Sequence, residues 1–405
     1  MVPRDGVTQR QLPAAAPVAF APWPQYDRDE VEVAANVLRS GKVNYWTGQE
    51  GRSFETEYAA ATGRRFGVAV HNGTLALELA LQAFGVGPGD EVVTTSRTFI
   101  ASASAVVMRG ATPVIADVDR DSQTVTAETI APLIGERTRA IIPVHLAGWP
   151  CDMPAIMELA RAHRLVVIED CAQAHGASLG GRPVGSFGDA GAFSFCQDKI
   201  ITTGGEGGML VLDDEEAWQR AWAFKDHGKS FDAVYHRDHP PGFRWLHESF
   251  GSNWRMTEFQ AAIGRLQLAR LPGSVERRRE HAAALNRAFT PLDALRLTVP
   301  PENVGHAYYK HYAFVRPEAL RAGWDRDRIM RTISEAGVPC YSGSCSEIYR
   351  ELAFTRAGLG PERRLPVARE LGETSLMFLV HPPLSDAAIA RTCDVVTDVV
   401  RAATR

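Results

Sequence analysis

The chain has 405 residues, of which 45% are hydrophobic and 23% are charged, and its formal net charge is −4 at pH 7. This composition is typical of a folded globular protein and excludes both a disordered acidic chain and a strongly basic nucleic-acid binder. Because the length exceeds that of one ordinary core, we expect two packed units.

Neither a membrane segment nor a metal site is indicated. No stretch approaches the roughly 18 to 20 apolar residues that span a bilayer, and the amino terminus lacks the apolar run of a secretory signal. We therefore expect a cytoplasmic protein without a membrane partner. The cysteines lie far apart without a C-x-x-C pair, which favours free thiols over zinc ligands or disulfides. They are Cys151, Cys171, Cys196, Cys340, Cys345 and Cys393.

In chain order, residues 1–27 are rich in proline and alanine and predict an N-terminal lead segment. From 28 to 285, short β-branched runs alternate with longer helical stretches, which predicts a large α/β domain with a mostly parallel central sheet. Strands are predicted at 67–71, 91–95, 113–117, 139–144, 165–169, 190–195 and 208–212. Helices are predicted at 74–84, 100–109, 152–163 and 257–269.

The sequence pattern of the remaining chain is different. A charged helix is expected at about 274–289, and the proline-bearing stretch 297–305 follows it. A strand-like run, YYKHYAFVR, and a helix near 325–336 come next. We therefore predict a smaller α+β domain over 286–405.

The first candidate site element is HNGTLALELALQAF (71–84), in which a strand leads into an apolar helix. The free N–H groups and the positive dipole end of such a helix start bind anions, and the Thr74 hydroxyl adds a donor. A phosphate would fit there. Taken alone, Thr74 is more simply explained as a helix cap.

The second element is LVVIEDCAQAHG (165–176), an apolar strand that ends at Asp170. Ligands of open parallel sheets bind beyond the carboxyl ends of the strands, where this carboxylate would lie, although a helix cap is an equal alternative. Gln173 could bond a ligand oxygen. His175 is more simply explained as a packed, hydrogen-bonded histidine than as a catalytic group.

The third element is GDAGAFSFCQDKIITTGGEGGML (188–210). Its strand delivers Ser194 and then Lys199, and four glycines around Glu206 allow the backbone to approach a neighbour closely. Partial desolvation there favours the neutral amine that covalent catalysis needs.

Of the five lysines, Lys199 alone has this setting. We expect Lys42, Lys225, Lys229 and Lys310 to be surface or salt-bridge residues. Exposed charge is also the simpler account of Lys310 and His311, with a phosphate contact as the alternative.

Together the three elements place a phosphate cradle, a carboxylate and a lysine at neighbouring strand ends, which is what pyridoxal 5'-phosphate requires. The lysine would hold the cofactor covalently and later move a proton, while the carboxylate would keep the pyridine nitrogen protonated.

The motifs NGT, TFIASASA, IEDCAQAHGA, FSFCQDKIITTGGEGGM and NWRMTEFQAAIG occur in an order that resembles the DegT-type sugar aminotransferases, pyridoxal-phosphate enzymes of the aspartate-aminotransferase fold type I. The resemblance implies that Lys199 is the cofactor lysine and Asp170 the partner of the pyridine nitrogen. It further implies that Gln173 contacts the phenolic oxygen and that Phe99 stacks on the ring. The implied phosphate contacts are Gly73, Thr74, Ser194 and, from the other subunit of a homodimer, Asn253.

The resemblance also implies transfer of the amino group of L-glutamate to the ketone of a nucleotide-linked sugar. A lysine rather than a histidine at position 199 favours transfer over dehydration. The run IITTGGEGG favours carbon 4, so dTDP-4-keto-6-deoxyglucose is the first candidate, with an association to antibiotic biosynthesis. Alternatives are a nucleotide-sugar 3-aminotransferase, a cyclitol- or aminohydroxybenzoate-forming enzyme, and a regulator that binds the cofactor without turnover.

The residues that read the sugar and nucleotide are less patterned. Candidate contacts are Tyr45, Trp46, Tyr235, His236 and Tyr341, all in loop-like segments. Packing is an equally good account of loop aromatic residues.

Overall fold

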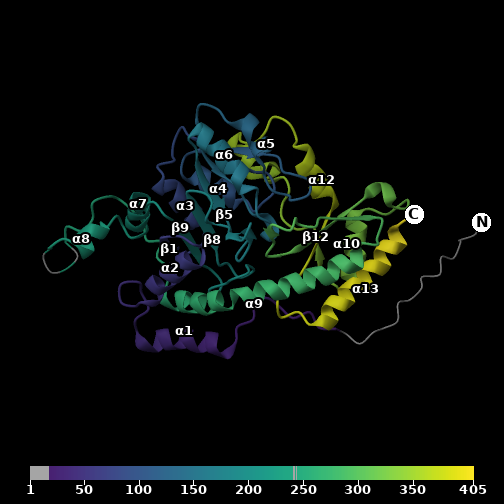
Figure 1. The fold of residues 1–405 in the computed structure, drawn as a ribbon, viewed down its shortest axis with the longest axis horizontal. Helices are drawn as coiled ribbons and strands as arrows, with labels where there is room; N and C mark the ends of the chain where they lie inside the picture. Colours follow the sequence, from purple (N-terminus) through teal and green to yellow (C-terminus); the bar gives the residue numbers. More distant parts are fainter. Residues whose placement is uncertain (1–17, 240–241, 243) are drawn as a thin grey trace, which may run out of the picture.

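A computed structural model describes residues 18–239, 242 and 244–405. Residues 1–17, the greater part of the predicted lead segment, lie outside the described residues. Two sheets and their helices are connected by one long helix, as Figure 1 shows. No helix in the described part of the chain combines the length and apolar character needed to cross a bilayer.

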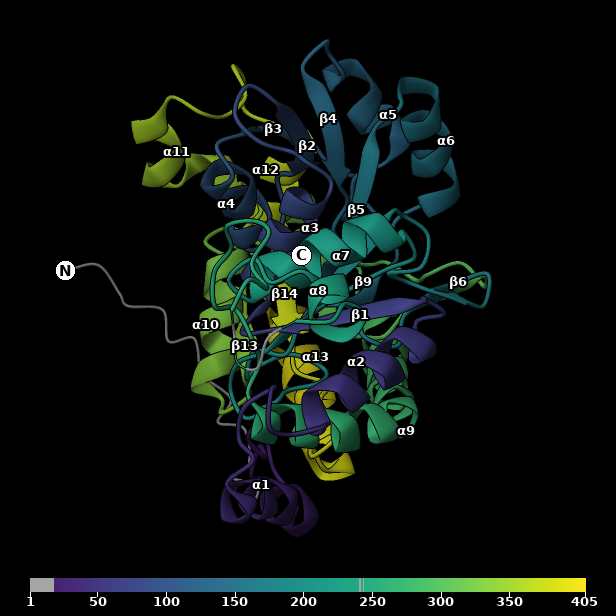
Figure 2. The same ribbon diagram turned by 90° about the vertical axis from the view of Figure 1, so that its left-hand side faces the viewer.

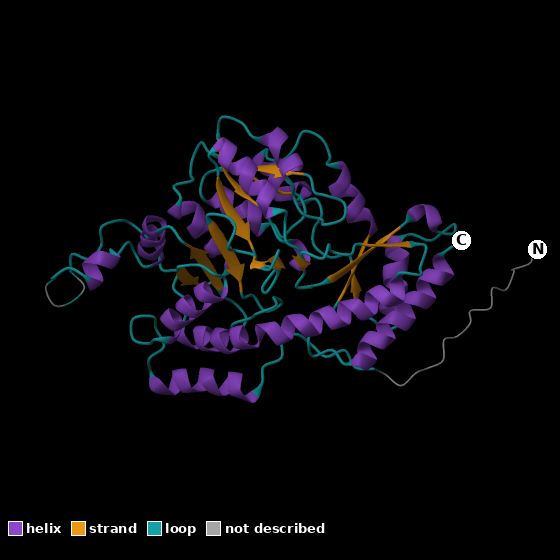
Figure 3. Ribbon diagram, in the orientation of Figure 1, coloured by secondary structure: helices purple, strands orange, loops and turns teal. Residues whose placement is uncertain are grey.

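A seven-stranded sheet forms the centre of the larger part (Figure 3). Its strands are β1 (Phe66–Val70), β2 (Glu91–Thr95), β3 (Thr112–Ala116), β4 (Thr138–Ile142), β5 (Val166–Asp170), β8 (Ala190–Ser194) and β9 (Gly208–Leu212). The order is β1-β9-β8-β5-β4-β2-β3, and β9 alone runs against the others. All seven predicted strands are present, with ends shifted by at most two residues, and the predicted mostly parallel sheet is confirmed.

Helices cover both faces of this sheet. The helices of the larger part are α1 (Arg28–Ser40), α2 (Glu50–Ala61), α3 (Gly73–Ala83), α4 (Ala101–Met108), α5 (Ala127–Ile130), α6 (Met153–His163), α7 (Glu215–Lys225) and α8 (Phe231–Tyr235). Apolar residues of α3 and α7 pack against one face of β1, β9 and β8. Residues of α2 and α9 (Glu258–Phe289) pack against the other, and Figure 2 shows α2 and α9 together below β1.

The helix α9 is continuous, whereas the sequence predicts two helices, at 257–269 and 274–289. Pro272 lies inside it, and a proline in a helix interior costs about 3 kcal/mol. The two halves bury residues in different cores: Ala261 and Val275 pack beneath the large sheet, and Leu285 packs in the smaller part. Burial at both ends outweighs the local cost and keeps the helix unbroken.

A four-stranded antiparallel sheet, in the order β10-β12-β14-β13, forms the smaller part. Its strands are β10 (Leu295–Leu297), β12 (His311–Val315), β13 (Cys340–Tyr341) and β14 (Ser375–Phe378), and its helices are α10 (Arg326–Glu335), α11 (Leu352–Ala357), α12 (Pro366–Thr374) and α13 (Asp386–Ala403). The strands β6 (Ser178–Leu179), β7 (Arg182–Pro183) and β11 (Val304–Gly305) form a third, small sheet. Short 3-10 turns occupy Ala131–Leu133, Leu146–Gly148, Pro317–Ala319 and Ile348–Arg350.

The large sheet and the four-stranded sheet are in direct contact. Tyr312 and Phe314 of β12 share a buried cluster with Ile141 and Val167 of the large sheet. Val18 and Phe20, at the start of the described chain, pack against the core of the smaller part. A pocket lined by residues of both parts lies where they meet.

Candidate active site

A cavity of about 410 Å³ lies at the carboxyl ends of β5 and β8, in front of the first turn of α3. The residues that line it are Asn72, Gly73, Thr74, Leu77, Thr98, Phe99, Ala101, Ser102, Asp170, Ala172, Gln173, Ser194, Cys196, Asp198, Lys199 and Glu206. The structure thus brings together seven of the eight residues that the sequence predicts around the cofactor: Gly73, Thr74, Phe99, Asp170, Gln173, Ser194 and Lys199.

One end of the cavity is the start of α3. The side chain of Asn72 caps the helix by accepting the N–H of Leu75 at 2.9 Å. Gly73 lies so close to β8 that a Cβ there would be 2.5 Å from the Cβ of Ser194, and a Cβ on Gly208 would be 2.3 Å from the Asn72 carbonyl oxygen. The glycines therefore let the helix start, β8 and β9 meet, and they leave backbone N–H groups at the end of the helix dipole, where an anion binds.

The opposite wall carries Asp170, which is only 5% exposed. The Ser102 hydroxyl donates to its Oδ2 at 2.7 Å, and the Ala172 N–H donates to its Oδ1 at 3.1 Å. Burial raises the pKa of Asp170, and these two hydrogen bonds oppose that rise. Among the described residues, no arginine or lysine forms an ion pair with it, so an ionised Asp170 lacks a close cation.

Gln173 and His175 follow β5 and have different roles. The Gln173 Oε1 accepts the N–H of Ala147 at 2.9 Å, which fixes the amide so that its NH₂ group is the one left to donate to a ligand. His175 is fully buried between the Tyr58 hydroxyl at 2.7 Å and the Ser194 carbonyl at 2.8 Å. The prediction of a packed, hydrogen-bonded histidine is confirmed, and burial lowers its pKa to about 3.

Lys199 stands beside an acid and an aromatic ring. Its Nζ lies 3.6 Å from Asp198 Oδ1 and 5.1 Å from the centre of the Tyr309 ring. The Tyr309 hydroxyl also donates to Asp198. Burial opposes ionisation of Asp198, yet Lys199 and this hydroxyl together hold its pKa below the usual value. Asp198 is thus an anion that holds the lysine amine at the cavity.

A wider pocket of about 700 Å³ continues outward past Phe99, Gln173 and Lys199. Phe99 is 67% exposed, so its ring face is open at the junction of the two cavities. Tyr341, one of the predicted substrate contacts, lines this outer pocket, and so do Tyr309 and Lys310. The pocket therefore offers a ring face, hydroxyl groups and a second amine within reach of Lys199.

The expectation of an exposed charge at Lys310 and His311 is wrong. Lys310 is half-buried in the outer pocket, 4.8 Å from the centre of the Tyr309 ring, and burial together with Arg278 lowers its pKa to about 8. His311 is 2% exposed and bonds Asn286 at 2.8 Å. Both residues lie in or beside β12, whose residues are all buried between the two sheets. Lys225 and Lys229 do form the expected salt bridges, with Glu55 and Asp226.

Four of the five predicted substrate contacts lie away from both cavities. Tyr45 is 3% exposed, and its hydroxyl bonds Glu55 and accepts from the Trp222 indole. Trp46 donates to Asp226. Tyr235 accepts from Arg52, while His236 is exposed next to Asp232. Within this chain, Tyr45 and Trp46 act in packing, because their polar atoms are already satisfied.

Asn253 is also outside the cavity of its own chain. It is exposed and is paired through its backbone with Asp226, which follows α7. The expectation from the family resemblance, contact with the site of another subunit, therefore stays a prediction.

Four residues at the site are not identified by the sequence motifs: Ser102, Asp198, Tyr309 and Lys310. Ser102 lies in the motif TFIASASA, and Asp198 lies in FSFCQDKIITTGGEGGM. Whether their side chains face the cavity depends on the local direction of the backbone, which the motifs do not specify. Tyr309 and Lys310 are distant in the sequence and reach the site through packing of the smaller sheet.

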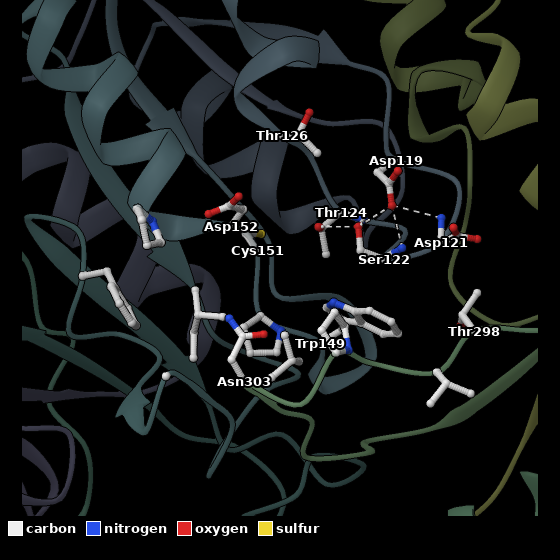
Figure 4. Close-up of a pocket in the computed structure, with 18 of the residues that line it drawn as sticks. Asp119, Asp121, Ser122, Thr124, Thr126, Trp149, Cys151, Asp152, Thr298 and Asn303 are labelled. Carbon is white, nitrogen blue, oxygen red and sulfur yellow. Dashed lines mark hydrogen bonds between the residues drawn. The ribbon is translucent and has the colours of Figure 1, made fainter.

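Another cavity, of about 630 Å³, lies elsewhere and is shown in Figure 4. Asp119 and Trp149 are among its lining residues. One carboxylate oxygen of Asp119 already accepts the N–H groups of Asp121 and Ser122 and the Ser122 hydroxyl. This carboxylate stabilises the local turn and needs no ligand.

A buried cluster of His145, Glu169 and Cys171 lies behind Asp170. Glu169 accepts the N–H groups of Gly185, Phe187 and Gly188, and it bonds His145 at 3.0 Å. The other ring nitrogen of His145 accepts the N–H of Cys151. These groups are satisfied by protein atoms, and the cluster supports the loop behind the site.

Comparison with known families identifies the chain. Residues 24–397 match the model of the DegT/DnrJ/EryC1/StrS aminotransferase family. The chain belongs to this family. Its members are aminotransferases that depend on pyridoxal 5'-phosphate.

Individual relatives of the DegT family cover nearly the whole chain. A UDP-N-acetyl-3-dehydro-alpha-D-glucosamine 3-aminotransferase of Acidithiobacillus ferrooxidans is 38% identical over 93% of this chain and 94% of its own. A 3-amino-5-hydroxybenzoate synthase of Amycolatopsis mediterranei is 35% identical over 94% of this chain and 97% of its own. The crystal structure of an aminotransferase from Psychrobacter cryohalolentis superposes with a TM-score of 0.94 and 54% identity, covering 95% of this chain and all of that one.

The residues present fit the family's cofactor. The helix start of α3 suits a phosphate, and the exposed face of Phe99 suits an aromatic ring. The buried Asp170 lacks a close cation, which a protonated ring nitrogen would supply. Lys199 supplies the amine. We therefore propose that these residues bind pyridoxal 5'-phosphate.

Proposed function

We propose that this chain transfers the amino group of L-glutamate to the ketone of a nucleotide-linked hexose, and that its first substrate is a dTDP-linked 4-keto-6-deoxyhexose, dTDP-4-keto-6-deoxyglucose foremost. One observation carries the proposal. Lys199 and Asp170 line the same cavity, which opens into a pocket of about 700 Å³, large enough for a sugar.

The chain's own residues have separate tasks. Bound pyridoxal phosphate supplies an electron sink for the carbon that loses its proton. Lys199 holds the cofactor and then accepts and returns that proton with its Nζ. Asp170 keeps a positive charge at the ring nitrogen, and Asp198 holds the lysine amine in place. Gln173 donates its NH₂ group to an oxygen on the ring.

The outer pocket supports the assignment of a sugar substrate. It presents Tyr309, Tyr341 and Lys310 around an opening beside Lys199. Hydroxyl groups and an amine suit a polyhydroxylated, negatively charged substrate. This pocket is not lined by four of the predicted contacts: Tyr45, Trp46, Tyr235 and His236. We therefore propose no contact between them and the substrate bound to their own chain.

A second candidate is transfer at carbon 3 of a UDP-linked sugar. The relative from Acidithiobacillus ferrooxidans carries that reaction in its name, and it shares 38% of its residues with this chain. The run IITTGGEGG at residues 200–208 supports carbon 4 instead. The relative from Amycolatopsis mediterranei is named for a different product, an aminohydroxybenzoate, which gives a third candidate reaction.

A panel of substrates tests the proposal. Purified enzyme is incubated with glutamate and with each of a dTDP-4-keto, a UDP-3-keto and a cyclitol ketone, and the products are identified by mass spectrometry. We expect the dTDP-4-keto sugar to give the highest kcat/KM. Preference for the UDP-3-keto sugar overturns the assignment of carbon 4 but keeps the reaction.

The order of the two half-reactions provides a second measurement. Because the amine is stored on the enzyme between substrates, initial rates at several fixed sugar concentrations should give parallel double-reciprocal lines. Intersecting lines contradict transfer through one shared site. Glutamate should also bleach the visible band of the bound cofactor. In a protein that only binds the cofactor, this band should remain.

A further inference from the structure

Residues 18–27 cross the turn that carries Lys199. The Trp23 indole N–H donates to the Lys199 carbonyl oxygen at 2.8 Å. Three residues further along, the Tyr26 hydroxyl accepts the N–H of Gly204 at 3.2 Å and lies 3.4 Å from the Thr202 hydroxyl. One short segment thus contacts both ends of the turn 199–204.

This segment is anchored in the smaller part of the molecule. Val18 and Phe20 pack against its core, and the His381 ring donates from Nε2 to the Ala21 carbonyl oxygen at 2.9 Å. The Trp23 ring lies 6.2 Å from the ring of His381. The segment therefore joins the Lys199 turn to a core whose buried residues lie between Ala282 and Ala403.

The face of the Trp23 ring also serves a buried cation. The Arg278 guanidinium carbon lies 5.3 Å from the centre of the indole ring, and Arg278 is 1% exposed. Its Nε and Nη2 have no hydrogen-bond partner in the structure, while its Nη1 donates to the Tyr309 carbonyl. Because two of its nitrogens lack a hydrogen-bond acceptor, the Arg278 guanidinium gains from contact with the face of the Trp23 ring. The same contact also holds the Trp23 ring in place.

The turn is also held by its own side chains and backbone: Ile200, Ile201, Thr202 and Thr203 are at most 1% exposed, and the Thr203 hydroxyl donates to the Glu206 carbonyl. The Lys199 N–H donates to the Cys196 carbonyl, and the Gln197 N–H donates to the Gly205 carbonyl. Gly204 and Gly205 adopt left-handed conformations, at φ values of 84° and 120°. The hydrogen bond from Trp23 acts on the Lys199 carbonyl itself, and it limits where the Cα and side chain of Lys199 lie.

We infer that Trp23 is a positioning residue for Lys199: its indole N–H fixes the Lys199 carbonyl and so directs the lysine amine into the cavity. Tyr26 holds the far end of the same turn. This inference rests on the proposed assignment of Lys199 as the cofactor lysine. Trp23 belongs to the predicted lead segment, which thereby gains a role in catalysis through contact with the turn.

The substitution Trp23→Phe isolates the hydrogen bond, because phenylalanine keeps a ring for Arg278 and loses the N–H donor. In the holoenzyme we expect about tenfold faster hydrogen exchange in the peptide that contains residues 198–204, the loss associated with one hydrogen bond. We also expect the pH midpoint of the cofactor's visible band to shift by about half a unit, because Lys199 moves relative to Asp198 and Lys310. The value of kcat should fall about tenfold, with KM for both substrates changed less than twofold.

Trp324→Phe is the matched control, since this tryptophan packs beneath Arg328 of α10 and not on the turn. It should leave exchange in 198–204, the pH midpoint and kcat unchanged. If Trp23→Phe lowers only the melting temperature, as a structural residue would, and leaves the other three readouts at wild-type values, the inference is wrong. Should that variant fail to fold, Tyr26→Phe applies the same three readouts to the Gly204 end, and unchanged exchange there overturns the inference.

A separate outcome concerns the proposed function. If Lys199→Ala retains a covalently bound cofactor, the assignment of Lys199 fails, whatever Trp23 does to the turn. Failure of the two proposals is therefore distinguishable.

Discussion

Asp170 places a carboxyl group in a buried position, where a serine hydroxyl and one backbone N–H are its close donors. Removing an ionised carboxylate from water is expensive unless a cation compensates for it. Across the cavity, Asp198 holds the Lys199 amine. We therefore propose that the two acids differ in function: Asp198 holds the lysine, and Asp170 pairs with a positively charged atom of the cofactor.

Asp170→Asn tests this difference. Asparagine keeps the shape of the side chain and one of its two accepting oxygens but carries no charge, so it cannot stabilise a protonated ring nitrogen. We expect the variant to bind the cofactor and to lose about 10²- to 10³-fold in kcat, as when a fixed electrostatic contact is removed from an active site. The control Asp152→Asn changes the cap of α6, where asparagine serves equally well, and should stay near wild type. Normal turnover of Asp170→Asn would refute the role.

We expect Lys310 to make substrate binding sensitive to alkaline pH. Burial lowers the pKa of Lys310 to about 8, so the amine is charged below that pH and neutral above it. We expect it to attract the anionic groups of a substrate in the outer pocket, and KM for the sugar nucleotide should therefore rise as pH increases through 8. In Lys310→Met this rise should disappear, while Lys42→Met, in an exposed loop, should retain it. An identical pH profile for Lys310→Met and wild type contradicts the prediction.

The sequence predicts Asp170 and Ser194 at the site because each ends an apolar strand. Gln173 and Lys199 follow the same two strands. Parallel strands end at one edge of a sheet, so these residues had to meet. The sequence predicts a surface or salt-bridge role for Lys310 because lysines are rarely buried. Its burial results from packing of β12 against the large sheet, and local sequence does not encode that contact.

At the scale of elements, the site depends on how closely the start of α3 approaches β8 and β9. The strand β9 runs antiparallel to its neighbours and brings Gly208 under Asn72. The glycine-rich turn predicted close approach to some neighbour, and the structure shows that the neighbour is the helix start. The helix α9 illustrates the opposite case: Pro272 is a valid local signal for a break, and burial at both ends overrides it.

Gly208→Ala tests the close approach. The added Cβ would lie 2.3 Å from a backbone oxygen, so β9 or the start of α3 must shift. We expect a loss of about 1 to 3 kcal/mol in the free energy of unfolding, together with weaker binding of pyridoxal phosphate measured by titration of the cofactor-free protein. Gly273→Ala, in α9 with no atom within 4 Å of the new Cβ, should instead gain about 0.5 to 1 kcal/mol. Unchanged cofactor affinity in Gly208→Ala contradicts this account of the helix start.

For the molecule as a whole, exposed residues beside the site point to a second copy of the chain. Asn253 is exposed and outside its own cavity, although the family resemblance implies a phosphate contact. Trp245 and Phe250, in the segment after α8, are 83% and 99% exposed. Figure 1 shows α8 extending away from the rest of the chain. We expect a two-fold dimer in which Asn253 of each subunit reaches the site of the other.

Mixed dimers test this arrangement. Lys199→Ala and Asn253→Ala are each expected to be inactive or strongly impaired, and the two variants are co-expressed with different tags. Random assembly makes half of the dimers mixed, and each mixed dimer has one site with both residues intact. Activity should therefore recover to about a quarter of wild type, as two-fold symmetry requires. If Asn253 acts within its own chain, no activity is recovered.

The most direct test of the account concerns the lysine itself. Wild-type holoenzyme is treated with sodium borohydride, which fixes a lysine-bound cofactor irreversibly, and is then digested and mapped by mass spectrometry. We expect the pyridoxyl group on Lys199 alone of the five lysines, and we expect Lys199→Ala to have neither the label nor the visible band. A label on Lys310 or another lysine, or full transfer activity in Lys199→Ala, contradicts the assignment of this cavity.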